Sequence, residues 1–132
     1  MAKKDTKEYE VSIRKTGKDM DVKERIGAKR LDDSMTLEKD MCIDLVNYAV
    51  LDIHNEKTKD GTKDYTVLAL FDKNGSRYHT SSESFMTSLF DILDEFEEAG
   101  MPIGSFEDGI AIKVCEKQSK NFAGNFYTCT VL

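Results

Sequence analysis

Three short segments of the chain combine aromatic rings with basic side chains, the two residue types that hold a single strand of nucleic acid. Bases stack on aromatic faces at about 1–3 kcal/mol each, and lysine or arginine neutralises the phosphates. The ten candidate residues are Lys57, Lys59 and Lys63, then Tyr65, Arg77 and His79, then Lys117, Lys120, Phe122 and Phe126. They act together only if strands and loops bring them onto one surface.

Each group also has a purely structural interpretation. The lysines from 57 to 63 also suit a solvated polar loop, and His79 also suits an exposed polar residue that stacks on nothing. Phe122 stands in the polar turn 118–124, where its ring either anchors the turn in the core or stacks on a base. Both interpretations stay open for all three.

Strand alternation sorts the remaining candidates by face, because successive side chains point to opposite sides of a sheet. Arg77 and His79 share one face, and if Arg77 faces solvent, Tyr78 points into the core. Tyr127 shares its face with the apolar residues at 129 and 131, so we expect Phe126 to point outward.

Catalytic chemistry has weaker support. His54 and His79 lie 25 residues apart, and neither stands near a nucleophile signature. The sequence contains no GxxxxGK[ST], GxGxxG or HExxH motif and no calcium-loop spacing. Carboxylates gather between 91 and 98, but no histidine accompanies them. We expect a non-catalytic protein without a cofactor, a metal or a small-molecule substrate.

The net charge of −6 argues against a phosphate-rich partner, but the charge is unevenly distributed. Residues 1–35 carry a balance of +2, and residues 36–132 carry −8. The stretch 85–108 alone holds seven acids and no base. Because the local field matters more than the total, a nucleic-acid strand can lie along one side while these acids face another.

The elements that must position the candidates begin after residue 35. Residues 1–35 are crowded with charge and predict a partly flexible arm, with room for one added strand over 9–13. Strands are expected over 42–53, 64–71, 76–80, 111–117 and 125–131. A polar loop is expected over 54–63, and Asn74-Gly75 predicts a hairpin turn with positive φ at both residues.

One amphipathic helix is expected after the third of these strands. Apolar residues recur at Phe85, Leu89, Ile92, Leu93 and Phe96, and Ser84 suits the N-cap position. Five strands with a helix between the third and fourth predict an all-β fold, an OB-fold-like Greek-key barrel spanning 36–132. A five-stranded sheet packed under a single helix has the same order.

The order and several segments resemble the small OB-type single-stranded DNA-binding proteins of bacteriophages. The resemblance rests on residues 35–40, 48–51, 65–71 and 117–128 and covers roughly 36–132. It implies sequence-independent coating of DNA strands in phage replication or recombination, without a cofactor. The chain departs from the pattern in lacking tryptophan, a frequent stacking residue, and in ending without a short acidic tail.

The expected partner is therefore single-stranded DNA. RNA is the less favoured ligand, because stacking faces do not distinguish the sugars. A protein–protein interaction or virion accessory module on the same small barrel remains the alternative, and self-association through an uncovered strand edge is open. No long apolar run occurs, and Cys42, Cys115 and Cys129 suit buried thiols in a reducing cytoplasm. We therefore expect no membrane association and a cytoplasmic location, in the host cell if the chain is phage-encoded.

Overall fold

The computed structural model describes residues 9–58, 61–119 and 124–132. The strands are β1 (Tyr9–Thr16), β2 (Met35–Thr36), β3 (Cys42–Thr58), β4 (Gly61–Asp72), β5 (Arg77–Thr80), β6 (Ile110–Gln118) and β7 (Asn125–Val131). The helices are α1 (Val22–Lys29) and α2 (Glu83–Glu98), with short 3-10 helices η1 (Leu31–Asp33) and η2 (Ile103–Ser105). Among the described residues, no helix is long and apolar enough to cross a membrane.

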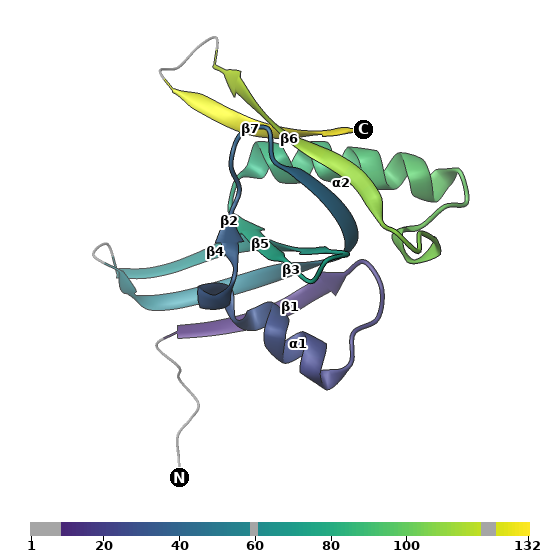
Figure 1. The fold of residues 1–132 in the computed structure, drawn as a ribbon. Helices are drawn as coiled ribbons and strands as arrows, with labels where there is room; N and C mark the ends of the chain where they lie inside the picture. Colours follow the sequence, from purple (N-terminus) through teal and green to yellow (C-terminus); the bar gives the residue numbers. More distant parts are fainter. Residues whose placement is uncertain (1–8, 59–60, 120–123) are drawn as a thin grey trace.

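The protein is mostly β, and its strands form one curled sheet that resembles half of a barrel (Figure 1). The strand order in the described ranges is β2-β5-β4-β3-β6-β7, and β1 also pairs with β3. β4 follows one edge of β3 from Leu45 to Thr58, while β6 and then β1 share the other edge. β3 therefore joins the two halves of the molecule.

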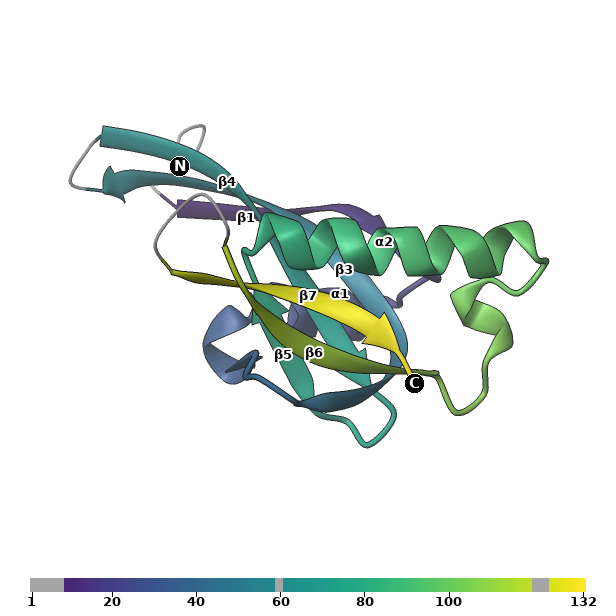
Figure 2. The ribbon, with the colours of Figure 1, turned by 90° about the horizontal axis from the view of Figure 1, so that it is seen from above.

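The length of β3 explains the curl. Its 17 residues span roughly 55 Å at the usual rise of a strand, which is longer than a strand in a flat sheet of this size would be. The pairing with β4 shifts register between Leu45 and Asn47, and such a bulge bends a strand and increases its twist. Viewed from above, β6 and β7 cross over the sheet formed by β3, β4 and β5, with α2 alongside them (Figure 2).

Two apolar clusters hold this sheet. The larger one lies on the inner side and joins α2, through Phe85, Leu89 and Leu93, to strand residues such as Val50 and Leu68. The smaller one lies under α1, and its buried members are Ala28, Ala49, Leu51, Ile53, Val67 and Ala69. β4 is therefore buried on both faces from Val67 to Leu70, as expected for a strand that lies between β3 and β5.

The predicted helix is confirmed, but its start was placed two residues late. The N-cap is Ser82, whose hydroxyl oxygen accepts a hydrogen bond from the amide of Phe85, so α2 begins at Glu83. Ser84 instead donates its hydroxyl to the carbonyl oxygen of Tyr127, 2.8 Å away. Ser84 thus ties the first turn of α2 to β7.

Two loop predictions were wrong in detail. The polar loop expected over 54–63 is mostly strand, because β3 continues to Thr58 and β4 starts at Gly61. Polar cross-strand pairs such as Asn55 with Lys63 extend the hairpin beyond the core. In the turn after β4, only Gly75 has a positive φ, of 90°, because the loop holds three residues closed by Asp72 and Ser76 rather than two.

The described part of the N-terminal segment contains more structure than one short strand. β1 runs from Tyr9 to Thr16 along β3, and α1 follows it, an element that the sequence analysis did not predict. Asp21 and Glu24 form a capping box at the start of α1. Cys42 is exposed rather than buried, since the first residue of β3 points outward, whereas Cys129 is buried and its pKa is raised to about 12 by desolvation.

Candidate nucleic-acid interface

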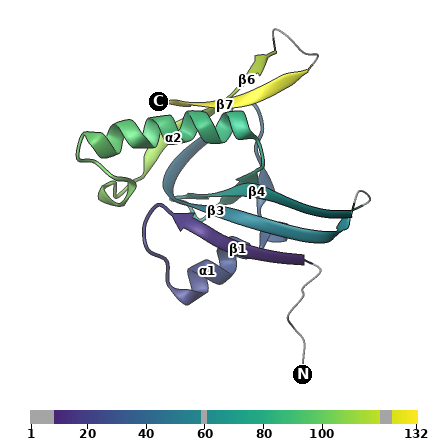
Figure 3. The ribbon, with the colours of Figure 1, turned by 180° about the vertical axis from the view of Figure 1, so that it is seen from behind.

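Two hairpins, β3–β4 and β6–β7, project from the same end of the molecule (Figures 1 and 3). Their strands continue beyond the apolar clusters, so the described residues there, such as Lys63 and Lys117, are not part of the core. Six of the ten candidate residues have described side chains: Lys63, Tyr65, Lys117 and Phe126 lie on these hairpins, and Arg77 and His79 lie on β5, next to β4.

The β6–β7 hairpin presents a cation beside an exposed ring on its outer side. Lys117 lies directly opposite Phe126, whose side chain is 38% exposed. Lys113 continues this β6–β7 outer face and lies 3.7 Å from the carboxylate of Asp40. Lys117 makes no ion pair with any residue that the structure describes. Tyr127 packs against the inner cluster, so the expected outward orientation of Phe126 is confirmed.

The β3–β4 hairpin carries two exposed tyrosines and a lysine on one face, together with β1. Tyr9, Asn55 and Lys63 lie side by side across the three strands, and Tyr65 lies opposite Ile53 in the next row. Tyr9 and Tyr65 are both exposed, and no described acid pairs with Lys63. Tyr9, Lys63 and Tyr65 form what we name the outer hairpin face.

Tyr9 was not among the candidates predicted from the sequence. Its pKa is raised, first by desolvation and then by the neighbouring Tyr65 and Asp32, so its phenol stays protonated at neutral pH. The alternation of residues 9–13 shows that Tyr9 shares a face with Val11 and Ile13. What the sequence does not show is that β1 pairs with β3 and so brings Tyr9 close to Tyr65.

The opposite face of the same hairpin is acidic. Glu10, Asp52, Glu56 and Asp64 lie there with two cations, Arg14 and His54. Arg14 forms an ion pair with Asp52 and donates a hydrogen bond to the hydroxyl of Thr66 at 3.2 Å. We name this side the acidic hairpin face. A phosphate would meet four carboxylates there, so the hairpin has one face suited to nucleic acid and one that repels it.

His54 is held between two of these carboxylates. Its Nδ1 lies 2.6 Å from Asp64 and its Nε2 lies 2.8 Å from Glu56. The hydrogen bond to Glu56, followed by that to Asp64, raises the pKa of His54. The imidazole therefore offsets the negative charge of the hairpin's own carboxylates.

Arg77 and His79 lie on the outer side of β5, under the N-terminal segment. Arg77 donates from Nη1 to the carbonyl oxygen of Gly27 at 2.9 Å, and Nδ1 of His79 lies 2.6 Å from the hydroxyl oxygen of Ser34. Both side chains are half-buried. The structure thus brings them to α1 and the turn after it, and a nucleic-acid strand on this face would have to replace those contacts.

The other candidates cannot be placed in the same way. Lys59, Lys120 and Phe122 lie outside the described residues, and Lys57 belongs to β3 but its side chain is not described. In the described ranges, no group of three or more His, Cys, Asp or Glu side chains is arranged to hold a metal.

Comparisons with protein-family models, with curated proteins and with solved structures find no match to this chain. The functional argument therefore rests on the geometry and chemistry of the molecule itself.

Proposed function

We propose that this protein binds single-stranded DNA without catalysis and largely without regard to sequence. One observation carries the proposal: each of the two projecting hairpins presents at least one exposed ring beside a lysine that no described carboxylate neutralises. Phe126 with Lys117 forms one such site, and Tyr9 and Tyr65 with Lys63 form the other. Exposed rings take any base, because every base has a flat π-face.

The energetics of these groups fit a binding surface. Stacking of one base on an aromatic ring contributes about 1–3 kcal/mol, so three rings contribute about 3–9 kcal/mol, and micromolar affinity, at about 8 kcal/mol, also needs the phosphate contacts. The lysines add a salt-dependent term through release of counterions from the phosphates. The acids from Asp91 to Glu98 belong to the C-terminal half of α2, which lies away from the hairpins, whereas Glu83 at its start lines a pocket with Lys63 and Tyr65 (Figure 3).

The arrangement of the elements supports an OB-type barrel. α2 lies between the third and fourth of the strands β3, β4, β5, β6 and β7, and the long β3 pairs with both β4 and β6. The sheet stays open between β2 and β7, as in a partly open Greek-key barrel. Hairpins that flank the binding surface are the ligand-holding loops of that fold.

The resemblance of the sequence to small OB-type phage proteins indicates a biological role for this activity. Phage proteins of the small OB type coat DNA strands during replication or recombination, and we propose the same role here, in the cytoplasm of the host cell. RNA is the alternative ligand for the same surface, since neither stacking nor phosphate contact depends on the 2′-hydroxyl.

Fluorescence polarisation with labelled oligo-dT and oligo-U tests the proposal. We expect saturable binding of oligo-dT at about 50 mM salt and micromolar protein, weakening steeply as salt rises. Phe126→Ala and Tyr65→Ala should each weaken binding about 5- to 100-fold, the loss of one stacked base. Met101→Ala, which shortens an exposed apolar side chain at the other end of the molecule, is the matched control when the oligonucleotide is short enough to hold a single protein molecule.

The outcomes separate the alternatives. Absence of binding to either oligonucleotide under these conditions would reject nucleic-acid binding altogether. Binding that Met101→Ala weakens as much as Phe126→Ala would reject the hairpin surface. Tighter binding of oligo-U than of oligo-dT would identify RNA as the ligand.

A further inference from the structure

An apolar groove lies between the C-terminal half of α2 and the end of β7, away from both hairpins. Its floor consists of Ile92, Phe96, Met101 and Val131, and the carboxylates of Asp91 and Glu95 stand on its rim. The groove encloses about 480 Å³. Met101 is 42% exposed, and Val131 is exposed to a similar degree, so the floor is open to a partner.

The local structure keeps this groove in shape. α2 ends in a Schellman motif, in which the amide of Met101 donates to the carbonyl oxygen of Phe96 at 2.8 Å and Gly100 takes a φ of 78°. The ring of Phe96 packs edge-on against Phe106 with centroids 5.4 Å apart. Met101 is thereby held at the surface by the backbone, and the floor exists before any partner arrives.

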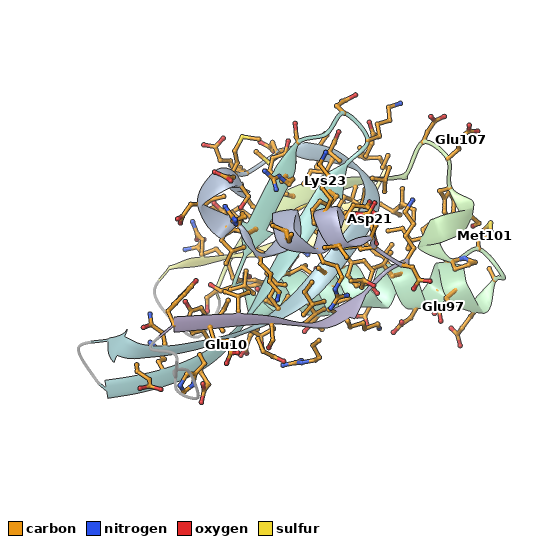
Figure 4. All side chains as sticks on the ribbon, turned by 90° about the horizontal axis from the view of Figure 1, so that it is seen from below. Glu10, Asp21, Lys23, Glu97, Met101 and Glu107 are labelled. Carbon is orange, nitrogen blue, oxygen red and sulfur yellow. The ribbon has the colours of Figure 1, made fainter. Side chains whose placement is uncertain are left out.

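The charge around the groove selects a basic partner. Residues 85–108 hold seven acids and no base, and Glu97, Met101 and Glu107 lie together at this end of the molecule (Figure 4). Among the described residues, Lys73 pairs with Asp108 at 3.9 Å, but no ion pair reaches Asp91 or Glu95. A basic segment with apolar side chains is the complementary occupant, whereas DNA is repelled.

The chain itself presents such a segment on the exposed side of α1. Val22, Arg25, Ile26 and Lys29 follow the i, i+3, i+4, i+7 spacing that places side chains on one helix face. Val22 is 74% exposed and Ile26 is 50% exposed, while the opposite side of α1 buries Ala28. These four residues, the α1 ridge, offer two apolar side chains flanked by two cations.

We propose that the α1 ridge of one copy docks into the α2–β7 groove of a second copy. Val22 and Ile26 cover the floor at Met101 and Val131, and Arg25 and Lys29 meet Asp91 and Glu95. Within one molecule Lys23 of α1 lies well apart from Met101 and Glu97, so the contact joins different copies (Figure 4). Ridge and groove are different surfaces, and the contact is therefore head-to-tail and able to continue from copy to copy.

The proposed contact buries a small area, and this area limits its affinity. An interface built from one short helix and one groove falls below the area that stable dimers bury, so it is weak between free molecules. On a shared DNA strand the copies are held at high local concentration, and a weak contact of this kind becomes occupied. α1 and the C-terminal half of α2 lie away from the projecting ends of the two hairpins, so we expect DNA binding and self-association not to compete (Figure 1).

Sedimentation without DNA tests the contact independently of the proposed function. At low salt we expect the average mass of the wild type to rise with protein concentration up to about 0.5 mM. A groove variant, Met101→Gln with Val131→Thr, and a ridge variant, Val22→Gln with Ile26→Gln, should each stay monomeric. The 1:1 mixture of the two variants should form a dimer and nothing larger, because it retains one intact ridge and one intact groove.

Charge reversal and a matched control complete the test. Arg25→Glu should abolish association, and adding Glu95→Arg in the same chain should restore it. Asp94→Asn with Glu97→Gln removes two acids of α2 that do not line the groove and should weaken association less than two-fold. Circular dichroism confirms that each variant is folded.

Three results would overturn the proposal. A wild type that stays monomeric up to about 0.5 mM rejects the contact. Association that survives either variant alone shows that other surfaces join the copies. A variant mixture that remains monomeric while the wild type associates rejects the head-to-tail pairing of ridge with groove. None of these results bears on oligo-dT binding, which is measured separately.

Discussion

At the scale of single residues, strand alternation determines on which face of the β3–β4 hairpin each side chain lies. Tyr65 and Lys63 alternate with Asp64, and Tyr9 alternates with Glu10, so each strand contributes to both faces. The outer hairpin face therefore gathers rings and a lysine while the other gathers carboxylates. A register slip of one residue would exchange the two sets, which makes the pairing of β1 with β3 part of the binding surface.

His54 gives a pH-dependent signature of the acidic hairpin face. Hydrogen bonds to Glu56 and then to Asp64 raise its pKa above the value of about 6.5 for a free imidazole. The stabilisation that the protonated ring brings is complete below about pH 6.5 and is lost as pH rises through the folded-state pKa. We expect an NMR titration of His54 to give a midpoint above about 6.5.

Variants separate this effect from the general pH response of the protein. Glu56→Gln should lower the His54 midpoint, because it removes the larger cause of the shift. His54→Gln should remove the part of the fall in melting temperature that the wild type shows as pH rises from about 6. A wild-type midpoint at or below that of a free imidazole would contradict the arrangement.

At the scale of elements, the junction between β1 and α1 depends on one glycine. A Cβ at Gly17 would lie 2.7 Å from Cε2 of Tyr48 and 2.9 Å from Cγ2 of Ile103. Gly17→Ala should therefore destabilise the protein by about 1–3 kcal/mol through overpacking. Urea unfolding measures the change, and Gly104→Ala, whose Cβ would come no closer than 3.8 Å to its neighbours, is the control.

The capping box of α1 makes a second prediction at this scale. Asp21 accepts a hydrogen bond from the amide of Glu24 at 2.8 Å, and Asp21→Ala removes it. We expect a loss of about 0.5–2 kcal/mol in stability, with faster hydrogen exchange concentrated in α1. Asp19→Ala removes the same charge two residues earlier without a cap. Equal effects of the two variants would mean that charge, and not capping, is responsible.

The elements also show how far the sequence predicts the structure. The apolar spacing from Phe85 to Phe96 predicts α2, because an amphipathic helix leaves a strong periodic signal. α1 was missed although Asp21 and Glu24 have the spacing of a capping box, since a polar helix of eight residues has almost no apolar period. Alternation placed Phe126 and Tyr127 correctly.

Long-range pairing limited the prediction of the site. The sequence places Arg77 and His79 on one face of a strand, but it does not show that Gly27 and Ser34 would cover that face. The acidic hairpin face was equally hidden, because Glu10, Asp52 and Asp64 become neighbours only when three strands pair. Contacts between residues far apart in the chain leave no local pattern.

At the scale of the whole molecule, charge is separated by position. The net charge of −6 includes the acids of α2 and the turn after it, at the end away from the hairpins. The α1 ridge carries cations on another side again. A molecule with this distribution can bind a polyanion with its hairpins and a copy of itself with α1, despite its acidic total.

The salt dependence of binding tests this distribution. The sequence predicts five lysines as phosphate contacts, at 57, 59, 63, 117 and 120, and each neutralised phosphate contributes a slope of about −0.7 in log K against log salt for a single strand. We therefore expect a total slope between about −2 and −3.5, measured with short oligo-dT to which one molecule binds.

Lys117→Ala should make the slope shallower by about 0.7. Lys73→Ala, in the turn after β4, should leave it unchanged. A wild-type slope near −7 would require about ten phosphate contacts, twice the number of lysines predicted for the surface, and would move the binding surface to the cations of the N-terminal segment.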